Sequence, residues 1–581
     1  GDSGRSPRMQ FHASSLADLN KVNRVSLIGY SGEPCNDTIT NNPKIRDCRL
    51  DASTFKGIEF IRSYSSIVHA IFKGVLLVFT LIRLLFSVAG KYTDSNGKLQ
   101  GSIPISFIII QNPPATPVVL ATLLYRILVY IMAICTFSNP AHQTFTICID
   151  WHNLGFSLYY DKYKPTHLLV RISYHFEHLM SKVSDLNFCV SAAMRKWLFL
   201  NYGIASTVFY DRPPKSVFQK FNSSTNSVAR GDGDSDDDRA DMNGSVSDED
   251  YMTLGGVPLS VRHELLLKLK LTDEALFPSL THCIHSTTES DLDLDHDLVG
   301  NMDTVMTEVT VQTYRHRDTG EVCVRQDRAV VLLSSTSWTP DENFSLLTKA
   351  LIKLDKSIAK RRGSESPRKK RDHSRRLLDQ RVSNVATRVV VVITGKGPMK
   401  EEFMSKWEAS QQPGSPTKLK YISLNTVWLE ICDYPLMVGC ADMGICLHTS
   451  SSGVDLPMKV LDMFGSAVPV CAVSFPALPE LVQNGTNGII FKTSSELSAH
   501  LFRLFCDFPH EANSLRDLKK MKKATLNIGC WEENWADIVQ PLILSALHRE
   551  ETPNWSFALS CTVYVLVIAV AYSVWLSATY R

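Results

Sequence analysis

One short segment of this chain combines the residue types that bind a nucleotide diphosphate. It reads as a strand over 444–449, then the loop Ser450-Ser-Ser-Gly-Val-Asp-Leu-Pro457, then a helix that ends at Gly465. Serine and glycine let backbone N–H groups approach a ligand closely, and the amino terminus of a helix attracts negative charge. We therefore expect the first four loop residues to hold a diphosphate: Ser450, Ser451, Ser452 and Gly453.

Two charged residues of the following helix extend this site. Lys459 lies in the first turn, where it adds a cation, and Asp462 follows three residues later on the same helix face. A carboxylate accepts hydrogen bonds from two hydroxyls at once, which is what a ribose diol requires. The segment therefore fits a bound nucleotide, a ligand that many classes of enzyme use.

A second loop with a cation follows another expected strand. It contains Gly395, Lys396 and Gly397 in the run Ile393-Thr-Gly-Lys-Gly-Pro398. The third glycine of a dinucleotide-binding fingerprint is absent, because position 400 is lysine. A nicotinamide-dependent enzyme is therefore not expected.

Both loops must be positioned by the elements around them, where short apolar runs alternate with helical patterns. This alternation is typical of parallel sheets covered by helices, and ligands of such sheets bind beyond the carboxyl ends of the strands. The sequence predicts two doubly wound, Rossmann-like α/β domains that face each other across a cleft, over 1–214 and 326–547. The expected strands are 24–29, 105–111, 144–150, 329–334, 388–394, 443–447 and 468–473.

Polar segments separate and interrupt these domains. Residues 215–325 read as a largely polar insertion, with a Ser, Asn, Gly and Asp-rich part over 220–256 that is expected to be disordered. A basic insertion, 356–381, is expected within the second domain. It is either a solvated loop or a contact with anionic lipid headgroups.

Charge and cysteine content narrow the class of protein. Lys and Arg number 61 against 59 Asp and Glu, so the whole-chain charge favours no nucleic-acid partner. The 14 cysteines form no Cys-x-x-Cys pair and no cluster with histidines, which favours reduced core residues over a disulfide frame or a zinc site. We expect no metal, no cofactor and a place on the reducing side of a membrane.

Three apolar stretches suggest contact with a membrane. The charge-free stretch 556–580 predicts a C-terminal transmembrane helix, with the large domains on the cytosolic side. Two further stretches, 67–89 and 118–137, each contain basic residues, so they are either interfacial helices or ordinary core-facing helices. No signal peptide is visible, and a start at Gly1 reads as processed or truncated.

Several short motifs are spread along the chain outside the polar insertions. The motifs of the first part are Gly4-Arg-Ser-Pro-Arg-Met-Gln10, Gln111-Asn-Pro-Pro114, Ile149-Asp-Trp-His-Asn153 and, near the end, Trp531-Glu-Glu-Asn-Trp535. Those of the second part are Ser334-Ser-Thr-Ser-Trp338, Gly395-Lys-Gly-Pro398, Asp433-Tyr-Pro435, Ala441-Asp442 and the run from His448 to Gly465. Taken together, these motifs resemble one enzyme family, the chitobiosyldiphosphodolichol beta-mannosyltransferases, and the resemblance covers most of the chain.

The resemblance implies a GT-B glycosyltransferase with GDP-mannose as donor and dolichyl-diphosphate-linked chitobiose as acceptor. Such an enzyme adds the first mannose in a beta-1,4 linkage on the cytosolic face of the endoplasmic reticulum. Enzymes of this fold generally use no metal at a DxD motif, so Asp232-Gly-Asp234 and Asp291-Leu-Asp293 are interpreted as parts of solvated linkers. By the same similarity Asp462 binds the donor ribose, and Ser452 or Asp455 is a candidate contact of the donor sugar.

Inverting transfer needs a base for the acceptor hydroxyl and positive potential for the departing diphosphate. His152 and Asp150 follow a strand of the first domain, and an ordinary imidazole pKa of ~6.5 suits cytosolic pH better than a carboxyl pKa of ~3.9. Both stay candidates for the base, beside a purely structural role. Lys459, Lys396 and the loop amides are expected to stabilise the leaving group. The acceptor diphosphate is expected to be held by Gly4, Arg5 and Arg8, with a simple helix-start role as the alternative for the two arginines.

Two departures and two alternatives accompany this assignment. Family members usually have an N-terminal anchor and a first strand before the loop of Gly4 and Arg5, and both are absent here, so the first sheet is expected to be weakened. The alternatives are a non-catalytic, donor-binding scaffold of the dolichol pathway and an enzyme of the same fold with another donor. Membrane lipid and other dolichol-pathway mannosyltransferases are further candidate partners.

Overall fold

The computed structural model describes residues 2–51, 66–93, 99–102, 104–113, 116–135, 145–160, 163–215, 257–277, 306–325, 327–364, 387–506, 508–509 and 512–547. The predicted anchor over 556–580, both DxD motifs and most of the basic insertion lie outside these residues. The chain divides into two units. The first comprises Gly1–Asp211, Ser451–Asp455 and Trp531–Arg581, and the second comprises Arg212–Ser450 and Leu456–Cys530.

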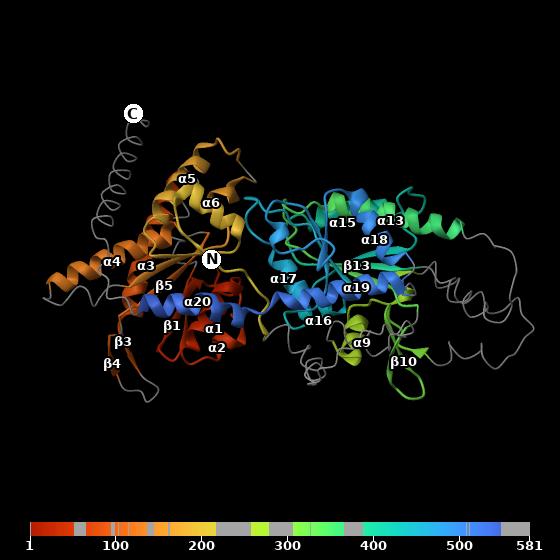
Figure 1. Ribbon diagram of the computed structural model, residues 1–581, viewed down its shortest axis with the longest axis horizontal. Coiled ribbons are helices and arrows are strands. Elements are labelled where there is room, and N and C mark those ends of the chain that lie inside the picture. The colour runs from red at the N-terminus through yellow and green to blue at the C-terminus, as the bar shows by residue number, and fades with distance from the viewer. Residues whose placement is uncertain are drawn as a thin grey trace, which may run out of the picture. The chain divides into compact units, whose positions relative to one another are not determined.

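The first unit contains two parallel sheets and a short hairpin (Figure 1). The strand order is β1-β2 in one sheet and β5-β6-β7-β8 in the other. The strands are β1 (Val25–Tyr30), β2 (Ile45–Leu50), β3 (Lys91–Thr93), β4 (Leu99–Ser102), β5 (Phe107–Asn112), β6 (Thr146–Trp151), β7 (Leu186–Cys189) and β8 (Thr207–Val208). The helices are α1 (Pro7–Ala17), α2 (Asp37–Thr40), α3 (Ser66–Val88), α4 (Thr116–Cys135), η3 (Gly155–Tyr159), α5 (Leu168–Ser181), α6 (Ala192–Tyr202) and α20 (Trp531–Leu547).

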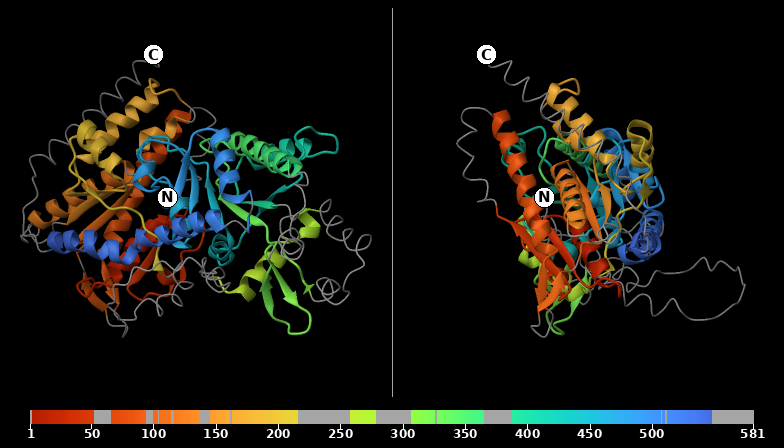
Figure 2. Two further views of the ribbon diagram at one scale, coloured as in Figure 1. Left: turned by 45° about the vertical axis from the view of Figure 1, so that its right-hand side comes forward. Right: turned by 90° about the vertical axis from the view of Figure 1, so that its left-hand side faces the viewer.

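The core of the first unit forms around β6, which is buried from Ile147 onward. A second cluster joins the sheet to α20, whose apolar residues Trp531, Trp535, Val539 and Ile543 recur every four positions and so share one face. This burial explains why a helix far along the chain belongs to the first unit (Figure 2). An apolar cavity of about 410 Å³ lies between β1 and β5, which are edge strands of the two parallel sheets of this unit.

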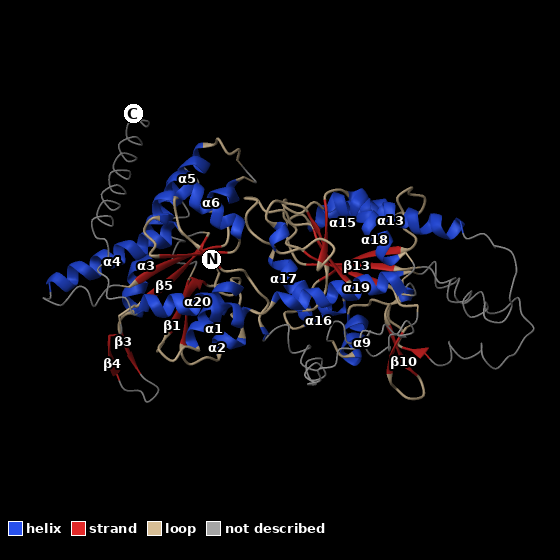
Figure 3. Ribbon diagram, in the orientation of Figure 1, coloured by secondary structure: helices blue, strands red, loops and turns tan. Residues whose placement is uncertain are grey.

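The second unit is built on one six-stranded parallel sheet with the order β14-β13-β12-β15-β16-β17. Figure 3 shows helices on both faces of this sheet. The strands are β12 (Val330–Ser335), β13 (Val389–Thr394), β14 (Ile422–Val427), β15 (Met443–Cys446), β16 (Val470–Val473) and β17 (Gly488–Phe491). The helices are α13 (Phe344–Ser364), α15 (Lys400–Ser410), α16 (Asp433–Cys440), α17 (Met458–Gly465), η5 (Leu478–Glu480), α18 (Ser494–Phe505), α19 (Ala512–Thr525) and η6 (Leu526–Ile528).

The expectation of parallel, helix-covered sheets in both parts of the chain is confirmed, and each predicted strand overlaps an observed one. The parallel strands of the first unit form two sheets rather than one. The near-continuous apolar runs of β12 and β13 reflect burial on both faces, which a helix-covered parallel sheet requires. Local alternation of strand and helix patterns therefore predicted the class of both units, but not the strands β2, β7, β8, β14 and β17.

Part of the segment expected to be a polar insertion is folded. It contains α9 (Leu259–Lys268), α10 (Asp273–Leu276) and an antiparallel sheet of β9 (Met306–Thr307), β10 (Thr313–His316) and β11 (Val322–Val324). Leu265, Leu266, Leu271 and Phe277 are buried, which gives this part a small core that composition over the whole segment concealed.

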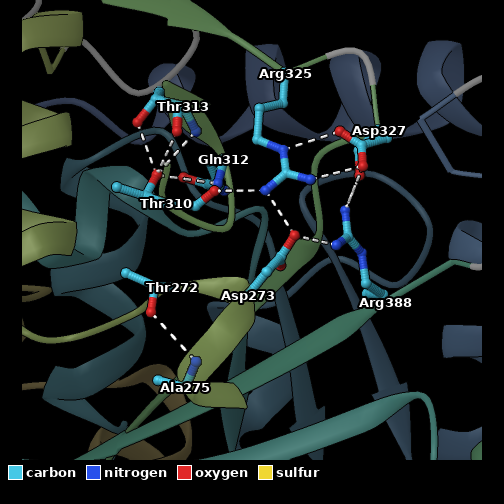
Figure 4. Close-up of polar contacts among 9 residues, drawn as sticks. All are labelled: Thr272, Asp273, Ala275, Thr310, Gln312, Thr313, Arg325, Asp327 and Arg388. Atoms are coloured by element: carbon cyan, nitrogen blue, oxygen red, sulfur yellow. Dashed lines mark hydrogen bonds and ion pairs between the residues drawn. The ribbon is translucent and has the colours of Figure 1, made fainter. Parts of the chain in front are cut away.

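A buried network of charges ties the folded part of the insertion to the second unit's sheet (Figure 4). Arg325 contacts Asp273 at 2.6 Å and Asp327 at 2.7 Å, and Arg388 pairs with the same two carboxylates. Asp327 and Arg388 precede β12 and β13, so the network lies at the amino ends of these strands. Ligands of a doubly wound sheet bind at the opposite ends, and we therefore give the network a structural role.

Within the described residues, no helix is long and apolar enough to cross a bilayer. The two apolar stretches of the first unit form α3 and α4, which pack on each other. Arg126 of α4 is buried, bonds to Asp185 at 2.5 Å and also donates to the carbonyl of Phe145. This arginine is therefore part of the core of the unit.

Candidate active site

The sheet of the second unit has one position where the strand order reverses, between β12 and β15. Chain connections run from β12 toward β14 on one side and from β15 toward β17 on the other. In doubly wound sheets, ligands bind at this switch point, outside the carboxyl ends of the two strands. A nucleotide site is therefore expected at the loops that follow β12 and β15.

The loop after β12 folds around the carboxylate of Glu342. This carboxylate accepts hydrogen bonds from the backbone N–H groups of Ser337 and Trp338, each at 3.0 Å, and from the hydroxyl of Thr336. Trp338 takes a left-handed conformation, φ 51°, in the turn that carries these donors. Lys459, in the first turn of α17, forms an ion pair with the same carboxylate. The predicted diphosphate-binding lysine is thus placed at the switch point by a buried carboxylate.

The loop after β15 carries a second acid–base pair at the same switch point. Nδ1 of His448 lies 2.5 Å from Oδ2 of Asp341, and both side chains are 23% exposed. The backbone N–H and the hydroxyl of Thr449 donate to the Asp341 carbonyl at 3.1 and 3.0 Å. Burial raises the pKa of Asp341, but hydrogen bonds from His448 and Thr339 outweigh it and lower this pKa to about 2. Asp341 is therefore a permanent carboxylate beside His448.

Asp462, the predicted ribose acceptor, lies at the end of a hydrogen-bond chain. The Tyr434 hydroxyl donates to its carboxylate at 2.9 Å and lies 2.9 Å from the Ser335 hydroxyl at the end of β12. Burial raises the pKa of Asp462 to about 7, against the opposing effects of the Tyr434 hydrogen bond and the Lys459 charge. Asp462 thus changes charge near neutral pH and faces the same strand ends as Lys459.

The glycine loop after β13 packs tightly against the loop after β12. A Cβ atom at Gly395 or Gly397 would lie 1.8 Å from the carbonyl oxygen of Thr336 or Ser337, respectively. Gly395 also has a φ of 129°, which favours glycine. Lys396 lies between them, with Nζ 3.6 Å from the ring centroid of Trp428. These glycines bring two loops together, and Lys396 stacks on an aromatic ring of the same unit.

The serine-rich loop is divided between the units. Ser450 belongs to the second unit, whereas residues 451–455 belong to the first. Within the loop the Ser452 hydroxyl donates to Asp455 at 3.1 Å, and Gly453 has a φ of 75°. These contacts shape the loop, and the diphosphate and sugar contacts expected of Ser450, Ser451, Ser452, Gly453 and Asp455 stay predictions.

In the first unit, Arg8 and Asp150 bind each other. The Arg8 guanidinium donates to the two Asp150 carboxylate oxygens at 2.7 and 2.8 Å and to Asp211 at 2.6 Å, and it is 1% exposed. Burial raises the pKa of Asp150, but the Arg8 charge outweighs it and holds this pKa well below its usual range. A carboxylate held in this way is a poor base. The guanidinium fork of Arg8, buried and occupied by two carboxylates, is likewise not placed to bind an acceptor diphosphate.

His152 has a different environment from Asp150. Its Nε2 is buried and has no hydrogen-bond partner among the residues that the structure describes. Burial lowers the pKa of its imidazole, although the charge of Asp211 opposes this. The imidazole is therefore neutral near pH 7, as a general base must be.

The loop that carries His152 is held by a buried carboxylate. Glu177 accepts from the Asn112 side chain at 2.9 Å and from the backbone N–H groups of Gly155 and Phe156 at 3.2 and 3.1 Å. The backbone N–H of His152 donates to the Asn112 carbonyl at 2.9 Å. These contacts fix the backbone from which the imidazole projects.

Gly4 and Arg5 lie in the turn before α1. A Cβ atom at Gly4 would lie 2.1 Å from the Glu33 carbonyl oxygen, so the backbone approach requires glycine. The Arg5 side chain is 71% exposed and pairs with Glu33 at 3.1 Å. Of the three predicted acceptor-binding residues, Arg5 is the one whose charge lies at the surface of the unit.

Four residues of the switch point were not assigned a role from sequence: Asp341, Glu342, Tyr434 and His448. Tyr434 and His448 lie within the motifs on which the resemblance rests. The sequence therefore marked both residues but did not indicate which groups they contact. Asp341 and Glu342 follow Trp338 by three and four positions in a segment without regular secondary structure. The contacts that give them importance connect residues more than 100 positions apart along the chain.

Known proteins similar to this chain include several glycosyltransferases. A Mus musculus protein named chitobiosyldiphosphodolichol beta-mannosyltransferase is 32% identical over 554 residues, which is 95% of this chain and 89% of the relative. The Homo sapiens protein of that name is 31% identical and covers 94% and 91%. UDP-glycosyltransferase TURAN of Arabidopsis thaliana is 30% identical and covers 94% and 97%. No protein-family model matches the chain.

Among solved structures, Anabaena Alr3699/HepE in complex with UDP and glucose is 12% identical at a TM-score of 0.47, covering 94% of this chain and 98% of its own. A glycosyltransferase from Rickettsia africae ESF-5 is 11% identical at a TM-score of 0.44 and covers 94% and 96%. The identity to the mouse relative extends over nearly the whole of both chains. The chain therefore belongs to the chitobiosyldiphosphodolichol beta-mannosyltransferase family of glycosyltransferases.

Proposed function

We propose that this protein transfers mannose from GDP-mannose to dolichyl-diphosphate-linked chitobiose, with inversion to a beta-1,4 linkage. The observation that carries the proposal is the placement of Lys459 and Asp462 at the switch point of the second unit, in a chain of this family. Lys459 supplies a cation for the diphosphate, and Asp462 supplies a carboxylate for the ribose diol. The fold we propose is GT-B.

The chemistry requires two groups in addition to the donor site. The acceptor hydroxyl must lose a proton as its oxygen attacks C1 of mannose. His152 is the candidate base because its imidazole is neutral and its Nε2 has no hydrogen-bond partner among the described residues. The departing diphosphate must be stabilised, which we assign to Lys459, Lys396 and the amides of 450–453. No metal or cofactor enters these steps.

A lipid acceptor places the reaction at a membrane, which we propose is the cytosolic face of the endoplasmic reticulum. Two helices of the first unit expose apolar side chains: Phe72, Val75 and Phe79 on α3, and Leu128, Ile131 and Met132 on α4. An isolated exposed apolar side chain is ordinary, but six on two helices that pack together suit a lipid surface.

The decisive experiment incubates the purified full chain with a synthetic lipid-diphosphate chitobiose and GDP-mannose. The expected product carries one added hexose that a beta-mannosidase removes. Formation of an alpha-linked product, or of no product with a correctly folded protein, would contradict the proposal.

A second candidate is an enzyme with a uridine diphosphate donor, because one relative carries the name UDP-glycosyltransferase. The same incubation with UDP-glucose and UDP-N-acetylglucosamine separates the two. Full turnover with a UDP-sugar and none with GDP-mannose would replace the mannose assignment. A non-catalytic scaffold is distinguished by the absence of turnover with every donor.

A further inference from the structure

We infer that His448, positioned by Asp341, is a further catalytic residue that binds the terminal phosphate of the leaving nucleotide diphosphate. The inference deepens the proposed function and depends on the presence of a nucleotide-sugar donor in the second unit. It begins from position. His448 lies two residues after the end of β15 and Asp341 lies in the loop after β12, so the pair occupies the switch point of the sheet.

The pair is held from several directions. Nδ1 of His448 contacts the Asp341 carboxylate at 2.5 Å, and Thr449 donates twice to the Asp341 carbonyl. Glu342 and His448 also form an antiparallel bridge between their backbones. The imidazole is consequently fixed relative to the loop that organises Glu342 and Lys459.

The Asp341 contact determines which ring nitrogen is available. An ionised carboxylate can only accept, so Nδ1 carries the proton that faces Asp341. Nε2 is left for a ligand, and none of the described residues forms a hydrogen bond with it. The ring is partly exposed, at 23%, as a residue that contacts a bound ligand must be.

The neighbouring charges suit an anion of two phosphates. Two acid–base pairs lie next to each other at the carboxyl ends of β12 and β15: His448 with Asp341, and Lys459 with Glu342. The Glu342 carboxylate accepts from backbone N–H groups of its own loop, and the Asp341 carboxylate contacts only one ring nitrogen of His448. Lys459 and His448 therefore each keep the capacity to donate a hydrogen bond to a second acceptor. A single lysine can neutralise one phosphate, and a second donor beside it suits the other phosphate.

In the transfer step, the bond between C1 of the sugar and the β-phosphate oxygen breaks, and its electron pair stays on that oxygen. The acceptor oxygen forms the new bond to C1, and its proton passes to the base. His448 donates as the imidazolium paired with the Asp341 carboxylate, the form in which Nδ1 and Nε2 both carry a proton. Its Nε2–H donates a hydrogen bond to a non-bridging oxygen of the β-phosphate, and this bond strengthens as charge develops. His448 ends the step in the protonation state in which it began.

The test compares the binding of GDP and GMP by calorimetry to the full chain and its variants. For His448→Ala we expect GDP affinity to fall about 10- to 100-fold, as loss of a hydrogen bond to a charged group does. GMP affinity should change less than about twofold, because GMP lacks the β-phosphate. His448→Gln, whose amide N–H can replace Nε2–H, should retain most of the GDP affinity. Asp341→Asn should fall between these two variants.

A general loss of structure would move GDP and GMP together, so equal losses of both, or no loss of either, would overturn the inference. His500→Gln on α18 is the matched control and should bind both nucleotides as the parent does. If the parent chain binds UDP and not GDP, the proposed donor is wrong, and the comparison of UDP with UMP then decides the role of His448. With the correct donor, kcat of His448→Ala should fall about 100-fold or more.

Discussion

The ion pair between Lys459 and Glu342 joins the first turn of α17 to the loop after β12. Glu342 is 3% exposed and fixed by two backbone N–H groups, so the lysine is oriented before any ligand binds. Lys459 can therefore meet a diphosphate without a large change in its own position, which favours catalysis by preorganised charge.

Replacement of Lys459 by alanine should lower kcat/KM for GDP-mannose about 100- to 1,000-fold, because the developing diphosphate charge loses a preorganised cation. Initial rates with a synthetic lipid acceptor measure this. Lys406→Ala, at an exposed lysine of α15, is the matched control and should react at the parent rate. A Lys459→Ala variant with unchanged kcat/KM would remove this residue from the mechanism.

The Arg8 network makes a prediction about stability rather than chemistry. Arg8→Met should lower the free energy of unfolding by about 3–5 kcal/mol, because it leaves the buried carboxylates of Asp150 and Asp211 without their partner. Urea denaturation measures the change. Arg5→Met, at an exposed arginine, should change the unfolding free energy by about 0.5 kcal/mol or less. Equal effects of the two substitutions would contradict the structural role of Arg8.

Asp462 predicts a pH dependence of stability. Burial raises its pKa in the folded state to about 7 from an ordinary value of 3.8. The protonated carboxyl thus favours the folded state, fully below pH ~3.8, and this contribution is lost as the pH rises through ~7. The Tm of Asp462→Asn relative to the parent should therefore be higher at pH 8 than at pH 5. A difference in Tm that is constant between these pH values would contradict the assignment.

At the scale of elements, the loops after β12 and β13 pack closely and shape the proposed donor site. Gly397→Ala should lower the free energy of unfolding by about 1–3 kcal/mol, because its Cβ would lie 1.8 Å from a backbone carbonyl oxygen. Thermal unfolding measures the effect. Gly74→Ala in α3 is the control, since nothing lies within 4 Å of its Cβ, and it should be neutral or stabilising. A stable Gly397→Ala variant would show that the two loops can separate.

For the molecule as a whole, the proposed donor predicts stabilisation by one nucleotide. A ligand that binds only the folded state at 100 times its Kd stabilises that state by about 2.7 kcal/mol. GDP should therefore raise the Tm of the full chain, and UDP at the same concentration should not. Lys459→Ala should lose the GDP shift, measured against the Tm of its own ligand-free form. If UDP raised the Tm as much as GDP does, this site would not discriminate between guanine and uracil, which would contradict the proposed preference for GDP.

The sequence by itself predicted parallel, helix-covered sheets in both parts of the chain and the segment that contains Lys459 and Asp462. These features depend on local patterns: apolar runs of strand length, a loop of small residues and a helix start at Pro457. The family was inferred separately, from the resemblance of motifs spread along the chain. Such patterns involve only residues that are close in sequence, so they can be recognised without knowledge of the fold.

The tertiary structure alone decided the roles of individual charged residues. It buried Arg8 against Asp150, joined α20 to the first unit, and brought Asp341 to His448 and Glu342 to Lys459 across more than 100 positions of sequence. The physical reason is that burial and pairing set what a charged group can do, and both depend on residues that are distant in the chain. Arg8, which the sequence predicts to be a phosphate ligand, is therefore a buried structural ion. His448, to which the sequence assigned no role, becomes a candidate catalytic residue.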